Sequence, residues 1–348
     1  MPSNTLFWQF FSDRMTVRVE RTRPVSAPPQ MLMTKTGKTL LVLMLMVVSA
    51  SLQAAFSINS DSSTQNEDSL YSIDLGSGLS KRVASLSPAK TDVEGLAFAP
   101  DGTLYAIDDE SLTLFPLNPS TALVDTASEV LLTGLSQAGR NDFGMTFACD
   151  GTLYVTSIAE NALYRVALGG QATRIGSLGV NISGIAAHGN PTRLYGLGNG
   201  LRSTGGDVVQ VDVPNLYEID TATGAASLVG PLGDQIDPYT EGGLDFDASG
   251  QLWAITDRRV PDNQPSQVFR IDRNSGTASG KQVLSEIGFE SLAIAPPAGC
   301  DPDSEPPPPP PPEPIHSRIA GVPTLGTMGL ALAVFLLLTT GLVATRRL

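Results

Sequence analysis

Histidine is nearly absent from this sequence, which has two in 348 residues. His316 lies in a proline-rich stretch and His188 lies far before it, so catalytic triads and dyads that depend on histidine have little to draw on. The sequence also lacks a Gly-x-Ser-x-Gly elbow, a Cys-x-x-Cys pair and a phosphate-binding glycine-rich loop at a helix start. These absences exclude the enzyme classes that such motifs mark.

Lysine and arginine are also scarce: there are 22 of them against 35 aspartates and glutamates, which gives a formal net charge of −13. Residues 56–300 carry 13 basic and 29 acidic side chains, a difference of −16. Such a surface repels nucleic acid, so we expect no nucleic-acid partner.

A repeated unit organises the middle of the chain. A strand of small residues, strand A, runs into a tight turn and then into a strand B that contains Leu-Tyr or Leu-Trp. Copies of this pair occupy residues 94–108, 142–156, 182–197 and 241–256, and a truncated copy occupies 289–297. Strand C follows at 70–74, 112–115, 163–166, 216–220 and 268–272, and strand D at 82–86, 130–135, 173–178, 226–232 and 281–287.

Short alternating strands bounded by Asp-Gly, Thr-Gly and Ser-Gly turns, at a period of about 40 to 60 residues, predict an all-β fold, a β-propeller with four-stranded blades. Strand B is present four times and the last strand A breaks off, whereas residues 55–59 supply an unpaired stretch before the first strand C. We therefore expect residues 56–300 to form about five blades, one of them completed by both ends of the domain. A β-sandwich and an open β-solenoid are the alternatives. The repeat region resembles secreted bacterial β-propeller proteins.

The N-terminal segment 1–55 reads as an extension and a secretory signal peptide. Lys35 and Lys38 precede the apolar run 40–48, and small residues including Ala54 and Ala55 follow it. We expect cleavage between Ala50 and Phe56, and export of the domain that follows.

Two further segments follow the domain. Residues 301–321 are rich in proline and predict a stiff, extended spacer. Residues 325–344 contain no charged side chain and precede Arg346 and Arg347, which predicts one membrane helix with its C-terminal flank in the cytoplasm. The membrane is thus an expected partner of the chain.

The C-terminal segment 322–348 resembles the IPTL-CTERM type of bacterial protein-sorting tail. The resemblance rests on Val322, Pro323, Thr324 and Leu325, together with the terminal arginines. The family usually begins with Ile and continues to a Trp-Gly pair, whereas this chain has Val322 and, at the pair, Thr327-Met-Gly329. The resemblance implies a Gram-negative envelope protein, anchored in the inner membrane with its propeller in the periplasm, and processing by sorting machinery that could move it to the cell surface. The alternative is a plain C-terminal anchor.

Acidic residues recur at the starts of the A strands, at Glu94, Asp142, Glu241 and Glu290. They would surround one mouth of the central channel, and a divalent cation such as Ca²⁺ would relieve their repulsion. The register opposes this hypothesis, because Glu94 and Glu290 lie one position from the aligned glycine or serine and the other two acids lie two positions away. Alternating strand faces would separate the two pairs, which then would cap backbone N–H groups instead.

Two long loops and two cysteines complete the candidates. The loops span 199–215, with Arg202 and Asp207, and 258–267, with Arg258 and Arg259, and both are expected on the face that carries the acids. Cys149 and Cys300 are expected together near the axis on the opposite face, where they either form a disulfide or remain free.

Two functions follow from these features. The first is a non-catalytic recognition module that holds a protein, a glycan or a small ligand on its loop face. The second is a calcium-dependent hydrolase that resembles the lactonase and gluconolactonase propellers, although those families have more blades and further Asn, Asp or His ligands. A third alternative is a cation that stabilises the ring without taking part in binding or catalysis.

Overall fold

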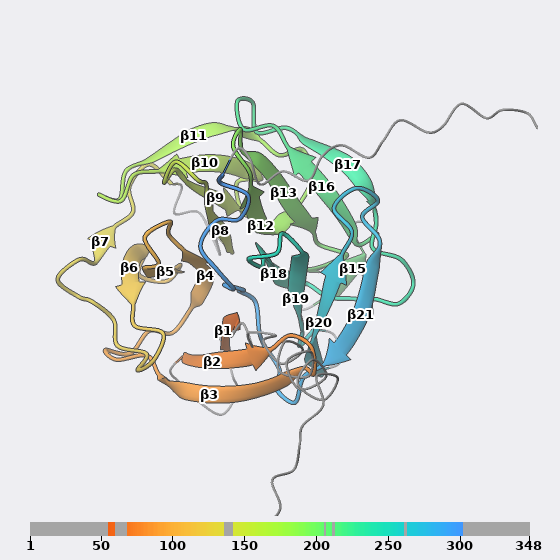
Figure 1. The fold of residues 1–348 in the computed structure, drawn as a ribbon, viewed down its shortest axis with the longest axis horizontal. Coiled ribbons are helices and arrows are strands. Elements are labelled where there is room, and N and C mark those ends of the chain that lie inside the picture. The colour runs from red at the N-terminus through yellow and green to blue at the C-terminus, as the bar shows by residue number, and fades with distance from the viewer. Residues whose placement is uncertain are drawn as a thin grey trace, which may run out of the picture. The chain divides into compact units, whose positions relative to one another are not determined.

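The computed structural model describes residues 55–59, 68–135, 142–204, 207–210, 213–260 and 263–301; the side chains of residues 202–208 are not among what it describes. In these residues the chain is all β, without a helix, and five sheets stand around a central axis as the blades of a propeller (Figure 1). The predicted five-bladed propeller is confirmed for this part of the chain, and the sandwich and open-solenoid alternatives are wrong.

Four blades are complete antiparallel sheets whose strands follow one another in the order A, B, C and D. The first two are formed by β4 (Val93–Phe98), β5 (Leu104–Asp108), β6 (Thr113–Leu117) and β7 (Val130–Leu131), and by β8 (Phe143–Phe147), β9 (Leu153–Ser157), β10 (Ala162–Val166) and β11 (Ala172–Ser177). The other two are formed by β12 (Ile182–His188), β13 (Arg193–Gly198), β16 (Asn215–Ile219) and β17 (Ala226–Pro231), and by β18 (Glu241–Phe246), β19 (Leu252–Arg258), β20 (Gln264–Ile271) and β21 (Ala278–Val283). The A strands lie nearest the axis (Figure 1).

The fifth blade joins both ends of the domain. Its B, C and D strands are β1 (Ala55–Asn59), β2 (Ser69–Asp74) and β3 (Leu79–Ser85), and residues 289–293 take the place of strand A. The N–H of Phe56 donates to the carbonyl of Ala293 at 2.7 Å, and the N–H of Ala293 donates back at 2.9 Å. The predicted closure is therefore confirmed, and it leaves no A–B edge free in this blade.

The sharp turns between A and B strands follow directly from the Asp-Gly sequence. Gly102 adopts a φ of +85°, which side chains with a Cβ rarely tolerate. The carboxylate of Asp101 accepts the N–H of Thr103 at 2.9 Å and fixes the reversal. Residues 150–152 repeat this arrangement.

The hydrophobic core lies between neighbouring blades. One cluster joins Ile107 and Leu114 of the first blade to Phe143, Phe147 and Val155 of the second, all of them buried. Because each blade buries one face against the next, the closing blade is needed to cover the faces at both ends of the series.

A strap of residues 295–300 continues from the closing strand across the middle of the ring toward β8 and β9 (Figure 1). The N–H of Gly189 donates to the carbonyl of Ala298 at 2.9 Å, and Cys300 forms a disulfide with Cys149, with 5.2 Å between their Cα atoms. Cys149 follows the C-terminal end of β8. The strap therefore covers the end of the channel that lies opposite the starts of the A strands.

The two segments expected to be long loops are more regular than their composition indicates. Within residues 199–215 a hairpin forms from β14 (Leu201–Thr204) and β15 (Asp207–Gln210). Half of 258–267 belongs to β19 and β20, because Arg258 pairs with Gln264 at the end of the ladder. The loop expected at 258–267 is therefore shorter than predicted, because residues 258 and 264–267 belong to strands.

The signal peptide, spacer and tail lie outside the described residues, as do the sorting-motif and flanking residues Val322, Pro323, Thr324, Leu325, Arg346 and Arg347. Within the part of the chain that the structure describes, no helix is long and apolar enough to cross a membrane.

Candidate cation site at the mouth of the ring

The central channel is built from three consecutive residues of each A strand, stacked in three layers. The residues that line it are Glu94–Leu96, Phe143–Met145, Ser183–Ile185, Gly242–Leu244 and Glu290–Leu292. Four glycines and Ser291 form the middle layer, and five buried apolar side chains form the inner layer. The space left for water is about 10 Å³, about enough for one molecule. The channel is therefore a plugged core, and only its outer layer is open to chemistry.

Glycine in the middle layer lets neighbouring A strands approach backbone to backbone. A Cβ on Gly184 would lie 2.4 Å from the carbonyl oxygen of Gly242, and one on Gly243 would lie 2.3 Å from the backbone nitrogen of Leu292. No real Cβ contact is that short, so the narrow ring depends on these residues. The close approach also brings the outer-layer side chains of different blades together.

Three carboxylates converge at the open mouth of the channel, two from the outer layer and Glu241 from the position just before Gly242. Glu94, Glu241 and Glu290 each place an oxygen within 4.8 Å of the others. Glu94 and Glu290 are 8% and 4% exposed, and Glu241 is half-buried. Two blades lie between those of Glu94 and Glu241 along the chain, and the β12 blade contributes Ser183, whose hydroxyl is buried and has no hydrogen-bond partner among the described residues. The expected separation of the acids into two pairs is wrong.

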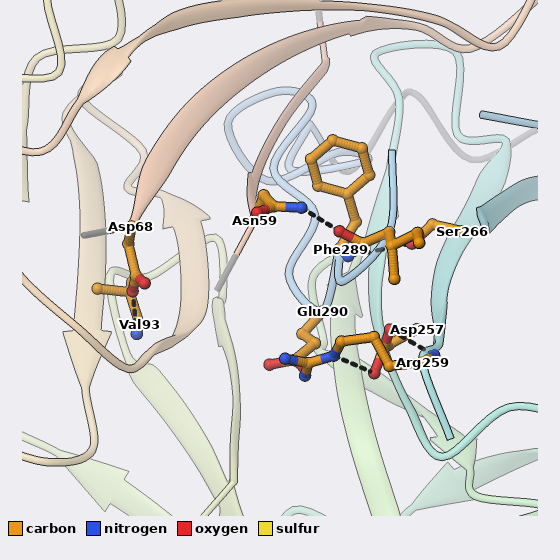
Figure 2. A network of polar contacts seen from close by, with 9 residues as sticks. Asn59, Asp68, Val93, Asp257, Arg259, Ser266, Phe289 and Glu290 are labelled. Atoms are coloured by element: carbon orange, nitrogen blue, oxygen red, sulfur yellow. Dashed lines mark hydrogen bonds and ion pairs between the residues drawn. The ribbon is translucent and has the colours of Figure 1, made fainter. Parts of the chain in front are cut away.

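A β-bulge explains why the acids meet. Val93 pairs with Asp108 and Gly95 pairs with Ile107, so Glu94 has no residue opposite it. A bulge of this kind re-aims a side chain and adds twist. The bulge is held by Asp68, a buried residue whose carboxylate accepts the N–H of Val93 at 2.6 Å (Figure 2).

Glu94 is the electrostatic centre of the mouth. Burial raises the pKa of its carboxyl well above the ordinary value, and the charges of Glu241, Asp142, Asp92 and Asp109 raise it further, in that order. Its carboxylate accepts no hydrogen bond from the described residues that could offset the desolvation. The surroundings of Glu94 therefore disfavour a bare carboxylate, and a proton or a cation would relieve this.

The four acids predicted from the sequence do not all join one group. Asp142 lies close enough to act on the charge of Glu94, but it lies outside the group of three. Asp92 and Asp109 form a second group with Glu94, again with oxygens within 4.8 Å of one another. Neither Asp92 nor Asp109 was predicted from the sequence. Asp109 could have been found, because it occupies the same place in its repeat as Asp257 does in the fourth blade.

Arg259 supplies a positive charge to the mouth. Its Nε donates to Asp257 Oδ2 at 2.9 Å, its backbone N–H donates to the other oxygen of Asp257 at 3.0 Å, and its guanidinium forms an ion pair with Glu290. Figure 2 shows the guanidinium between the two acids. Both acids are buried, at 1% and 4% exposure, so the arginine satisfies two carboxylates that need a countercharge.

The other predicted loop residues do not take part in the mouth. Arg258 donates to the carbonyl of Pro265 at 3.1 Å and lies 3.5 Å from Asp237, which also pairs with Lys281. Arg202 and Asp207 lie in β14 and β15, and their side chains are outside what the structure describes. Of the four loop residues, the structure brings Arg259 to the acids.

No family model matches the chain, and no curated protein matches its sequence. Solved structures with a similar arrangement include a protein of unknown function from Bacteroides caccae, with a TM-score of 0.41, 11% identity and coverage of 70% of this chain and 99% of the other. A gluconolactonase from Xanthomonas campestris has a TM-score of 0.40 and 14% identity, with coverage of 69% and 80%. A catalytically inactive virginiamycin B lyase from Staphylococcus aureus, with quinupristin, has a TM-score of 0.37 and 14% identity, with coverage of 68% and 72%. Likeness this distant carries no argument about chemistry.

Proposed function

We propose that this chain is an exported, membrane-tethered recognition module whose acidic mouth holds a divalent cation, Ca²⁺ by its chemistry. The observation that carries the proposal is the convergence of Glu94, Glu241 and Glu290 within 4.8 Å. Two oxygens that each lie about 2.4 Å from one ion are at most about 4.8 Å apart, so the three carboxylates fit a shared cation.

The donor set supports a hard cation with oxygen ligands. Every candidate ligand at the mouth offers oxygen: three carboxylates and the unpartnered hydroxyl of Ser183. Ca²⁺ accepts six to eight oxygens in flexible geometry, which leaves positions for oxygens of an external ligand. A cation at this place would join the ring to a hydroxyl-rich or carboxylate-bearing glycan, protein or small molecule.

The cellular setting of the proposal comes from the sequence. The signal peptide would export the propeller, the spacer and membrane helix would tether it in the inner membrane, and the sorting tail would pass it to processing machinery and on to the cell surface. The excess of acidic residues in the domain argues against a nucleic-acid partner.

A calcium-dependent hydrolase is the second candidate, and the raised pKa of Glu94 favours it. A carboxyl whose pKa is raised by burial can take or release a proton beside a cation. We favour recognition because the described residues offer no activated nucleophile near the mouth, and the acids are accounted for without catalysis.

A thermal melt of the full-length protein with Ca²⁺ and with a chelator tests the proposal. Ca²⁺ at 100 times its dissociation constant should stabilise the fold by about 2.7 kcal/mol. The Glu94→Gln, Glu241→Gln double variant should lose this gain while it keeps the Glu290–Arg259 pair. An Asp234→Asn variant, which changes an exposed acid, is the control. Identical melts with Ca²⁺ and chelator would refute the cation site.

Turnover separates the two candidate functions. A panel of lactones and phosphoesters is incubated with the wild type and with a Glu94→Gln variant, with and without Ca²⁺. Hydrolysis that requires both Ca²⁺ and Glu94 would establish the hydrolase, whereas Ca²⁺-dependent stabilisation without turnover supports recognition.

A further inference from the structure

We propose that Arg259 is a built-in competitor of the cation: its guanidinium holds Glu290 when no metal is present, and it withdraws to Asp257 when a divalent cation binds. The inference rests on the proposed function, because it concerns the occupancy of the same mouth. It adds a residue that sets the affinity of the site.

Arg259 has a second anchor that does not depend on Glu290. Asp257 receives both the Nε–H and the backbone N–H of Arg259, at 2.9 and 3.0 Å. The carbonyl of Arg259 also accepts the N–H of Asn263 at 2.7 Å. The backbone of Arg259 is thus held on both sides, and leaving Glu290 requires a change in the side chain only.

Both arrangements pair the buried acids. Without a cation, Arg259 satisfies Asp257 and Glu290. With a divalent cation, the metal would satisfy Glu94, Glu241 and Glu290, and Arg259 would satisfy Asp257. Asp257 and Glu290 thus keep a countercharge in both arrangements, so both arrangements are accessible to the same fold.

Competition follows from charge and from position. The guanidinium of Arg259 contacts the carboxylate of Glu290, which the cation would also need. A guanidinium and a metal ion bound to the same carboxylate would repel each other. The apparent dissociation constant of the cation is then its intrinsic value divided by the fraction of molecules in which Glu290 is accessible. Removing the guanidinium should tighten cation binding, although it removes a charged group from an otherwise well-paired site.

The chain offers a matched control in Arg258, the neighbour on the same hairpin. Arg258 and Arg259 have similar burial, with side chains 14% and 20% exposed, but Arg258 pairs with Asp237 outside the mouth. A change in net charge is the same for either arginine. A difference between the two variants therefore reports the contact with Glu290.

The test is a calorimetric titration of Ca²⁺ alone into the full-length wild type, Arg259→Gln and Arg258→Gln. We expect Arg259→Gln to bind Ca²⁺ at least tenfold tighter than the wild type, and Arg258→Gln to bind within about twofold of it. An Arg259→Lys variant, which cannot fork between two carboxylates, should lie between the two and covers the case in which Arg259→Gln does not fold.

Nuclear magnetic resonance of the arginine side chains reads the movement itself. The signals of Arg259, assigned by their loss in Arg259→Gln, should show that Nη contacts are released on addition of Ca²⁺ while the Nε–H stays protected by Asp257. Equal Ca²⁺ affinity in the wild type and both Arg259 variants overturns the competition and leaves the cation site standing. Absence of Ca²⁺ binding in every folded variant overturns the cation site itself.

Discussion

Replacement of Asp245 by asparagine should change how stability depends on pH. Asp245 lies in β18, and its carboxylate accepts the N–H of Ile294 at 2.7 Å and the N–H of Phe246 at 2.8 Å. It thereby fixes the beginning of the strap to the fourth blade. Burial raises the pKa of Asp245 to about 7 and outweighs the lowering effect of the backbone N–H groups.

The sign of the effect follows from proton linkage. The pKa in the folded state exceeds the ordinary value of 3.8, so the folded protein binds the proton more tightly than the unfolded chain does. The stabilisation that protonated Asp245 gives to the folded state is fully present below about pH 3.8 and is lost as the pH rises to about 7. At 1.36 kcal/mol per pH unit this interval corresponds to about 4 kcal/mol. The partial exposure of Asp245 reduces the expected loss to about 2 to 4 kcal/mol.

Denaturant unfolding of the wild type and Asp245→Asn, with chelator present, at pH 4.5 and pH 8 measures this loss. Because part of the effect is already lost at pH 4.5, the difference in unfolding free energy between the two proteins should shift by about 2 to 3 kcal/mol against the wild type at pH 8. Asp247→Asn is the control, because desolvation of Asp247 is outweighed by hydrogen bonds from Ser249, Trp253 and the backbone, and its pKa is lowered. A wild-type advantage over Asp245→Asn that stays constant or grows with pH would refute the reasoning.

Two further predictions concern the ring. A Cys149→Ser, Cys300→Ser variant should lose about 3 to 5 kcal/mol of unfolding free energy in denaturant titrations, because the disulfide closes a loop with a sequence separation of 151 residues. Equal stability of the oxidised and the reduced wild type would contradict this. Gly184→Ala should lower the unfolding free energy by about 2 to 3 kcal/mol or more, because its Cβ would meet the carbonyl of Gly242. Gly169→Ala is the control: its Cβ would have nothing within 4 Å, so stability should change by less than about 0.5 kcal/mol. Similar melts of the two variants would argue against backbone contact at the axis.

The blades could be predicted because short-range sequence determines the strands and turns of each repeat. Asp101 and Gly102 favour a tight turn, and the alternating apolar residues on either side favour a strand with one buried face. The closure could also be predicted, since residues 55–59 and the truncated last repeat are complementary halves of one blade.

The site could be predicted only in part, because its geometry depends on register and on long-range contacts. Register separates Glu94 and Glu290 from Glu241, and the bulge held by Asp68 at Glu94 is what local periodicity does not show. The bulge needs a partner 25 residues away in sequence, and no local pattern encodes it. Arg259 was expected to face an external ligand, yet it satisfies two buried acids of its own ring.

The strap also determines where mechanical load enters the domain. Any pull on the chain beyond Cys300 passes through the disulfide to Cys149 and into the second blade. The hydrogen bonds between Phe56 and Ala293, which a pull on the closing strand would open one after another, are thus shielded from the load. Cys300 lies at the end of the channel opposite Glu94, so a molecule held from its C-terminal side would turn its acidic mouth away from the point of attachment.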